Sequence, residues 1–266
     1  MPSSRPGSQV GTVSGRAALT SAIPCLMSLK RSVKSLLAIA SIALITGALG
    51  ACHKSSTSTS TADSGPLPAA SDLITQASTA MSTVQTVHFT IAIDGTIAGL
   101  AVHKADGVLT HAGEAKGSAT ITYLGATIQA DFVVVGDSFY LKALTGGYQK
   151  LPLSSASSIY DPSAILDPNR GIPKLLSTAT NTKTVGATTI DGKTAYQVSL
   201  TPDPDAVKSL IPGAGAGTTG SIWIDKASGH VVKAVFTVPN SGGKPVTATI
   251  TLDNYDAPVT ISAPTS

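Results

Sequence analysis

Few side chains in this 266-residue chain commonly do chemistry: there are two cysteines and five histidines. The histidines are His53, His88, His103, His111 and His230. No two of them have the H-x-x-x-H spacing of a helical metal site, and the chain contains no G-x-S-x-G nucleophile elbow. Most carboxylates adjoin glycine or proline, as is typical of turns and helix caps. We therefore expect no enzyme, no metal site and no cofactor.

Cys52 is the residue with the clearest chemical role. It follows Leu49-Gly50-Ala51 at the end of the apolar stretch Leu36–Leu49, which is too short for a membrane span of about 20 residues. Three cations precede that stretch: Lys30, Arg31 and Lys34. This order is typical of a signal peptide, and residues 49–52 resemble the bacterial lipobox, whose cysteine is acylated and becomes the first mature residue. The alternative is an ordinary signal peptide with a chance cysteine.

The leader hypothesis divides the chain into three parts. We expect a leader over residues 1–51 (with Met27 as a candidate true start), the lipidated Cys52 with a Ser/Thr-rich linker over 52–66, and a folded domain over 67–266. Without the leader's five cations, 13 Lys and Arg face 15 Asp and Glu, a net charge of −2 instead of +3. The mature chain then has no basic excess that would indicate nucleic acid. Its expected location is the outer face of the cytoplasmic membrane, within the cell envelope.

Apolar spacing predicts one helix and then many strands. Residues Ser71–Val84 have the helical period, and from Val87 the period changes to two. The predicted strands are Val87–Ile97, Ala119–Tyr123, Ile128–Val134, Phe139–Ala143, Tyr196–Leu200, Ile222–Ile224, Val232–Phe236 and Val246–Leu252. Turn signals separate them at Asp106-Gly107, Gly136-Asp137, Asp191-Gly192 and Ser241-Gly242-Gly243. The pattern predicts an α+β fold with a large curved antiparallel sheet that has one apolar face.

Three Asp-Pro pairs indicate helix starts between the strands. Asp161-Pro162, Asp167-Pro168 and Asp203-Pro204 each place a capping carboxylate before a proline suited to the first helical turn. The expected short helices are Ser163–Leu166, Lys174–Thr180 and Asp205–Ile211. So few helical residues leave much of the apolar face uncovered, and the side chains on it are mostly slender. A cavity for a long apolar ligand follows, and the alternative is a sheet that closes fully on its own core.

Several segments resemble the mycobacterial LppX/LprAFG lipoprotein family. They are Gly65–Pro68, Ala130–Val134, Ile159–Gly171 (IYDPSAILDPNRG), Ile222–Ile224 and Val246–Val259. The resemblance implies a half-barrel related to the LolA/LolB carriers, which binds acylated lipids or lipoglycans in a hydrophobic cavity and assists their passage to the outer envelope. Asp253-Asn254-Tyr255 stands where Ser-x-Trp is common, and the loop Pro212–Gly220 is unusually rich in glycine. These departures leave the lipid and the subfamily open.

The predicted ligand contacts combine this resemblance with the strand alternation. They are Phe89, Ile91, Ile93, Ala119, Ile121, Phe132, Val134, Phe139 and Leu141 on the concave face, and Ile165 on a covering helix. The expected partners are an acylated lipid or glycolipid, the membrane through the lipid anchor, and a membrane lipid exporter as candidate donor; we expect a monomer. An envelope scaffold that docks a protein partner without lipid cargo is the alternative function.

Overall fold

The computed structural model describes residues 65–265, except 124, 144–145, 157–160 and 241–242. The leader with Met27, Cys52 and the linker to residue 64 lie outside the described residues, as do Ile159 and Tyr160 of the family-like segment. In the described part of the chain, no helix is long and apolar enough to cross a membrane.

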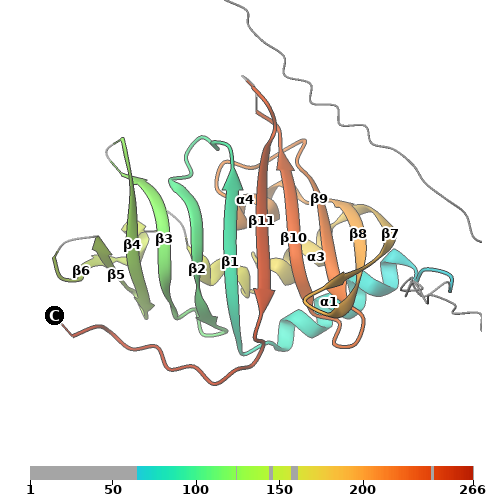
Figure 1. The fold of residues 1–266 in the computed structure, drawn as a ribbon, viewed down its shortest axis with the longest axis horizontal. Coiled ribbons are helices and arrows are strands. Elements are labelled where there is room, and N and C mark those ends of the chain that lie inside the picture. Colours follow the sequence, from blue (N-terminus) through green and yellow to red (C-terminus); the bar gives the residue numbers. More distant parts are fainter. Residues whose placement is uncertain (1–64, 124, 144–145, 157–160, 241–242, 266) are drawn as a thin grey trace, which may run out of the picture. The chain divides into compact units, whose positions relative to one another are not determined.

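One antiparallel sheet of eleven strands dominates the described residues (Figure 1). The strands are β1 (Thr86–Asp94), β2 (Val102–Thr110), β3 (Ala115–Tyr123), β4 (Ala126–Val135), β5 (Ser138–Ala143), β6 (Gln149–Pro152), β7 (Thr180–Ile190), β8 (Lys193–Thr201), β9 (Thr219–Asp225), β10 (Val231–Val238) and β11 (Val246–Asp253). Their order is β6-β5-β4-β3-β2-β1-β11-β10-β9-β8-β7, so the first and last strands pair at the centre. The α+β class and the single apolar face are confirmed, since β11 alternates strictly between buried and half-buried residues.

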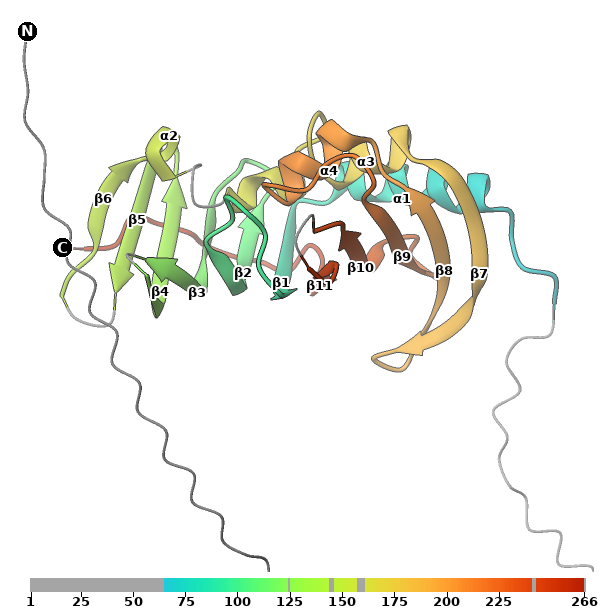
Figure 2. The same cartoon turned by 90° about the horizontal axis from the view of Figure 1, so that it is seen from above.

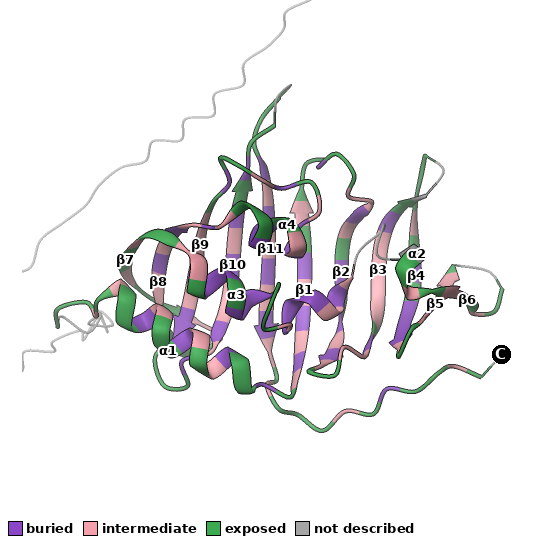
Figure 3. Ribbon diagram, turned by 180° about the vertical axis from the view of Figure 1, so that it is seen from behind, coloured by how far each residue is buried: buried purple, intermediate pink, exposed green. Residues whose placement is uncertain are grey.

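Short helices cover one face of this sheet, which we call the inner face. They are α1 (Ala70–Thr83), α2 (Leu153–Ala156), the 3₁₀ helix η1 (Pro162–Ile165), α3 (Ile172–Thr178) and α4 (Pro204–Leu210). In Figure 2 all of the α-helices lie on the same side of the sheet. Figure 3 shows α1, α3 and α4 over the half of the sheet that contains β7–β11, while β3 remains visible between them and α2. The α1 side chains Leu73, Ala77 and Met81 are buried at helical spacing, as predicted.

The three Asp-Pro pairs do not behave alike. Asp161 caps η1 by accepting a hydrogen bond from the Ser163 N–H, and Asp203 caps α4 in the same way. The prediction of a helix start at Asp167-Pro168 is wrong, because Asp167 instead closes a turn through the Asn169 N–H. The expected helix Lys174–Thr180 is also shifted: α3 begins two residues earlier, with Pro173 in its first turn, and ends at Thr178.

The prediction of a turn at Asp106-Gly107 is also wrong, because both residues lie within β2. Gly107 faces Gly117 across β2 and β3, where a Cβ on Gly107 would lie 3.1 Å from the Gly117 Cα. This glycine therefore permits close approach of two strands. The strand itself escaped prediction because its register shifts between Val102 and Lys104, which breaks the period of two. The predicted strand Val87–Ile97 is also too long at its end. The observed β1 ends at Asp94, and Ile97 is buried in the loop between β1 and β2.

Candidate functional site

Two rows of paired residues cross the inner face of β1–β5. In one row, Ile91 is followed across the strands by Ala105, Ala119, Ala130 and Ala143. In the neighbouring row, Phe89 is followed by Gly107, Gly117, Phe132 and Leu141. Alanine and glycine have short side chains or none, so the sheet surface is low where they meet. The two rows form a trough over β2 and β3, which we call the alanine–glycine trough, with Phe89 and Phe132 on its sides.

A small apolar cavity lies above this trough; we call it the strand cavity. It is lined by Phe89, Val102, Ala105, Ala119, Ile121, Phe132, Phe139, Leu141 and Pro162. All but Pro162 come from β1–β5, so η1 provides its roof. The Phe132 and Phe139 rings are stacked with centroids 6.4 Å apart. The cavity measures about 30 Å³, which is room for about one or two water molecules.

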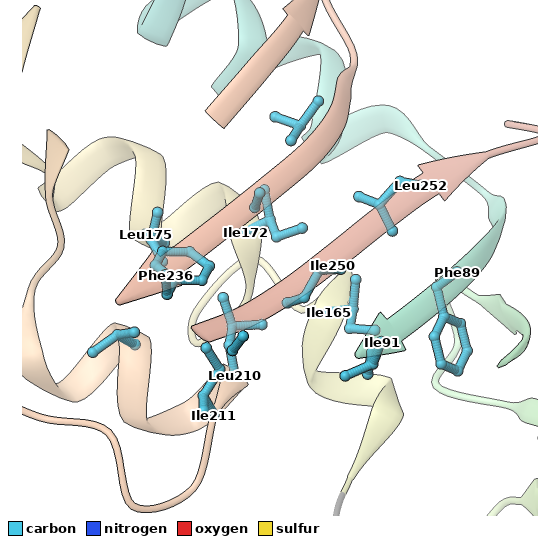
Figure 4. Close-up of a cluster of buried hydrophobic side chains, with 14 of the residues drawn as sticks. Phe89, Ile91, Ile165, Ile172, Leu175, Leu210, Ile211, Phe236, Ile250 and Leu252 are labelled. Atoms are coloured by element: carbon cyan, nitrogen blue, oxygen red, sulfur yellow. The ribbon is translucent and has the colours of Figure 1, made fainter. Parts of the chain in front are cut away.

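A second apolar cavity, which we call the helix cavity, lies beneath α4. It measures about 10 Å³ and is lined by Ile91, Ile93, Leu100, Val102, Leu210, Ile211, Ala248 and Ile250. Val102 lines both cavities, so they adjoin. Figure 4 shows apolar side chains of η1, α3 and α4 gathered over β1, β10 and β11. The side chains of the helices and of the strands belong to one buried cluster. Side chains therefore fill most of the space between the sheet and its helices.

The predicted contact residues all belong to this apolar region. Six line the strand cavity: Phe89, Ala119, Ile121, Phe132, Phe139 and Leu141. Ile91 and Ile93 line the helix cavity. Val134 and Ile165 are fully buried in the same cluster but line neither cavity. Sequence reasoning missed Val102, Ala105 and Pro162 in the strand cavity and Leu100, Leu210, Ile211, Ala248 and Ile250 in the helix cavity.

A polar cluster fixes the loop between η1 and α3. The Arg170 Nε lies 2.6 Å from Asp167 Oδ2, and its NH1 lies 2.9 Å from Asp161 Oδ2. Asp161 also accepts a hydrogen bond from the Ser163 hydroxyl. Burial of Asp167 disfavours its charge, but hydrogen bonds from Arg170 and the Asn169 N–H outweigh this and lower its pKa. Because η1 is the roof of the strand cavity, this cluster holds the roof in place.

Replacing Arg170 by glutamine is expected to destabilise the fold by about 1–2 kcal/mol at pH 7, since these ion pairs are partly exposed and screened by solvent. The lowered pKa of Asp167 means that its share is present above its unfolded value of about 3.9 and is lost as the pH falls through the lower folded value. Urea unfolding at pH 7 and pH 3 measures this. The exposed Lys174→Gln serves as the control. A wild-type advantage of equal size at both pH values would contradict the role of Asp167.

The opposite, outer face carries a contact that strand polarity alone did not reveal. His88 lies on the polar side of β1, where the sequence suggests a solvated side chain. Its Nδ1 instead lies 2.9 Å from Asp253 Oδ1 on β11, and its Nε2 lies 3.4 Å from Asp106 Oδ2 on β2. Among the residues that the structure describes, no group of three or more His, Cys, Asp or Glu is arranged to hold a metal ion.

Solved structures share this architecture. The crystal structure of LprF from Mycobacterium bovis has 26% sequence identity, a TM-score of 0.64, and coverage of 74% of this chain and 97% of that chain. The lipoprotein LppX of Mycobacterium tuberculosis has 24% identity and a TM-score of 0.57, with coverage of 73% and 98%. The second likeness concerns the fold alone.

Sequence relatives are more similar still. The lipoarabinomannan carrier protein LprG of Mycobacterium leprae is 34% identical over 205 residues, covering 76% of this chain and 84% of the relative. LprG of Mycolicibacterium smegmatis is 32% identical over 237 residues, covering 88% and 96%. These relatives are named as carriers rather than enzymes. The family model described as LppX_LprAFG lipoprotein matches residues 69–261. The chain therefore belongs to the LppX_LprAFG lipoprotein family.

Proposed function

We propose that this chain is a cell-envelope lipoprotein that binds acylated lipids or lipoglycans on the inner face of its sheet. It carries them from the cytoplasmic membrane towards the outer envelope. The observation that carries the proposal is the alanine–glycine trough, with phenylalanines on both sides and η1 above it. The lipoarabinomannan carriers among the relatives support the same cargo class. No catalytic step forms part of this function.

Acyl chains suit such a site because their binding depends on burial and needs few polar contacts. Each buried methylene contributes roughly 0.8 kcal/mol, so long chains bind tightly to an apolar trough. Cavities of about 30 and 10 Å³ are far smaller than an acyl chain. Loading therefore requires η1 and α4 to move off the sheet. These elements have only four and seven residues, so each has few backbone hydrogen bonds of its own to hold it.

Native mass spectrometry with lipid extraction tests this function. The full chain carrying Cys52→Ala is purified from an actinobacterial host, so that the attached lipid is not counted as cargo. We expect about one lipid with two or more acyl chains per protein molecule. A folded protein that carries no lipid after purification from that host would contradict the carrier function.

The small volume of the two cavities favours a second candidate, an envelope scaffold that docks a protein partner without lipid cargo. A nearly filled core needs no ligand to complete it. The same mass spectrum separates the candidates, because a scaffold remains empty even when it is purified from a lipid-rich host.

We also propose that residues 1–51 are removed, that Cys52 is acylated, and that residues 52–66 are a spacer on the outer face of the cytoplasmic membrane. Stable anchoring takes two or more lipid chains, which an acylated lipobox cysteine supplies. Cys52→Ala is expected to abolish palmitate incorporation and to release the protein from the membrane fraction. Metabolic labelling measures both, with Cys25→Ala as the matched control that keeps its label. Label retained by Cys52→Ala would contradict the assignment of Cys52 as the acylated residue.

The remaining partners follow from the same proposal. A membrane lipid exporter is the donor, and the loaded carrier acts as a monomer. Cross-linking in cells that captures no exporter would contradict the first point, and sedimentation of the loaded protein as a dimer would contradict the second.

A further inference from the structure

A much larger hollow lies at one end of the sheet, where three segments meet. They are the β7–β8 turn (190–194), the β9–β10 turn (225–230) and the end of β11 (252–255), and the hollow they line measures about 1170 Å³. Figure 2 shows the β7–β8 hairpin bending away from the helices, so its tip stands off from the rest of the sheet. We call this space the turn hollow. Unlike the two apolar cavities, it has ample room for a bulky ligand.

Two stacked rings belong to the lining of the turn hollow. The His230 and Tyr255 rings lie 4.2 Å apart at an angle of 24°. The Tyr255 hydroxyl donates a hydrogen bond to the Val231 carbonyl, which fixes the ring. Burial lowers the pKa of His230 and raises that of Tyr255, so both rings are neutral at pH 7. Neutral rings, of which Tyr255 is held by this hydrogen bond, offer flat apolar surface with polar edges.

The charges of the lining select the chemistry of the ligand. The lining contains three carboxylates, on Asp191, Asp225 and Asp253, and two ammonium groups, on Lys193 and Lys226. With His230 neutral, one net negative charge remains, which does not suit a phosphate. Asp225 is already occupied by hydrogen bonds from the Ala227 and Ser228 N–H groups. The hydroxyl, amide and carboxylate groups of the lining can donate and accept hydrogen bonds together, as a neutral ligand rich in hydroxyls requires.

From these features we infer that the turn hollow binds neutral sugar rings of the glycan that the lipid cargo carries. A sugar ring has an apolar C–H face for the aromatic rings and a rim of hydroxyls for the polar groups. The inference rests on the proposed function, because the sugar and the acyl chains belong to one molecule. Neighbouring strands connect the two sites: Leu252 lines the turn hollow, and Phe89, its register partner across β1 and β11, lines the strand cavity on the inner face.

Binding of arabinomannan from which alkali has removed the acyl chains tests the inference. Calorimetric titration uses the full chain with Cys52→Ala. Two further changes are made on this background, Thr194→Trp, which fills the hollow from an exposed position, and His230→Ala, which removes a ring. Each is expected to weaken arabinomannan binding at least tenfold. The matched control Thr188→Trp is at an exposed position of β7 that does not line the hollow, and it should stay within twofold of the parent.

Several outcomes would overturn the inference. These are no binding of arabinomannan to the parent chain, parent-like binding by Thr194→Trp, or competition by inorganic phosphate. Native mass spectrometry of the same samples keeps the two proposals apart. Retained acylated lipid without arabinomannan binding refutes the sugar site and leaves the carrier function standing. Arabinomannan binding by a chain that never holds lipid supports the sugar site and refutes the carrier function.

Discussion

Replacing Ala119 by tryptophan is expected to lower the affinity for acylated lipid by at least about tenfold. Ala119 lines the strand cavity, and its register partners Ala105 and Ala130 have equally short side chains. An indole placed there fills the alanine–glycine trough between Phe89 and Phe132. Displacing about two methylenes of an acyl chain costs roughly 1.6 kcal/mol, which corresponds to a little more than tenfold in affinity. Native mass spectrometry of the delipidated protein, titrated with an acylated lipid, measures the loss.

The matched control for this variant is Ala92→Trp. Ala92 is exposed on the outer face of β1 and lines neither apolar cavity, so the same side chain is added on the side of the sheet away from the trough. We expect this variant to keep its lipid and its unfolding midpoint. Equal lipid occupancy in both folded variants would contradict binding in the trough. Loss of lipid in both would mean that the substitution acts through the sheet rather than through the cavity.

The alternation of β1 shows how much of this fold can be predicted from the sequence. Phe89 and Ile91 face inward because every second residue of a strand points to the same side, and this rule gave all nine strand positions of the predicted site. The rule fails at Val102, where the register shift changes the phase of β2. It also does not predict the role of Gly107 and Gly117. These residues matter because they face each other across β2 and β3 and neither has a side chain. Such a trough becomes visible only when the pairing register is known.

Contacts between distant segments account for the rest. Leu210 and Ile211 lie at the end of a helix that the sequence predicts, but nothing local indicates that they meet Ile91 across the inner face. Likewise, Asp191 and Asn254 are typical turn residues, each with positive φ, and local turn chemistry explains them fully. That they line one hollow with His230 follows from the pairing of β7–β8, β9–β10 and β11 in a single sheet.

Replacing Gly171 by alanine is expected to destabilise the protein by at least about 3 kcal/mol, at the upper end of overpacking effects. A Cβ at this position would lie 2.6 Å from the carbonyl oxygens of Asp167 and Ile165, and closer still to that of Ala164. The backbone cannot easily yield, since the Gly171 N–H donates to the Asp167 carbonyl and its own carbonyl accepts from the Leu175 N–H. Urea unfolding measures the change.

Gly186→Ala is the control, because no atom lies within 4 Å of a Cβ built there and its backbone is not left-handed. It should be neutral or stabilising by up to about 1 kcal/mol, since glycine is unfavourable within a strand. Equal stability of the two variants would show that the η1–α3 loop adjusts freely. A loop that adjusts freely could not hold η1 over the strand cavity, so that result would also remove the physical reason for a closed, nearly filled site. If instead only Gly171→Ala unfolds early, the roof is held by backbone packing as well as by Arg170, and lipid entry must displace η1 without breaking this turn.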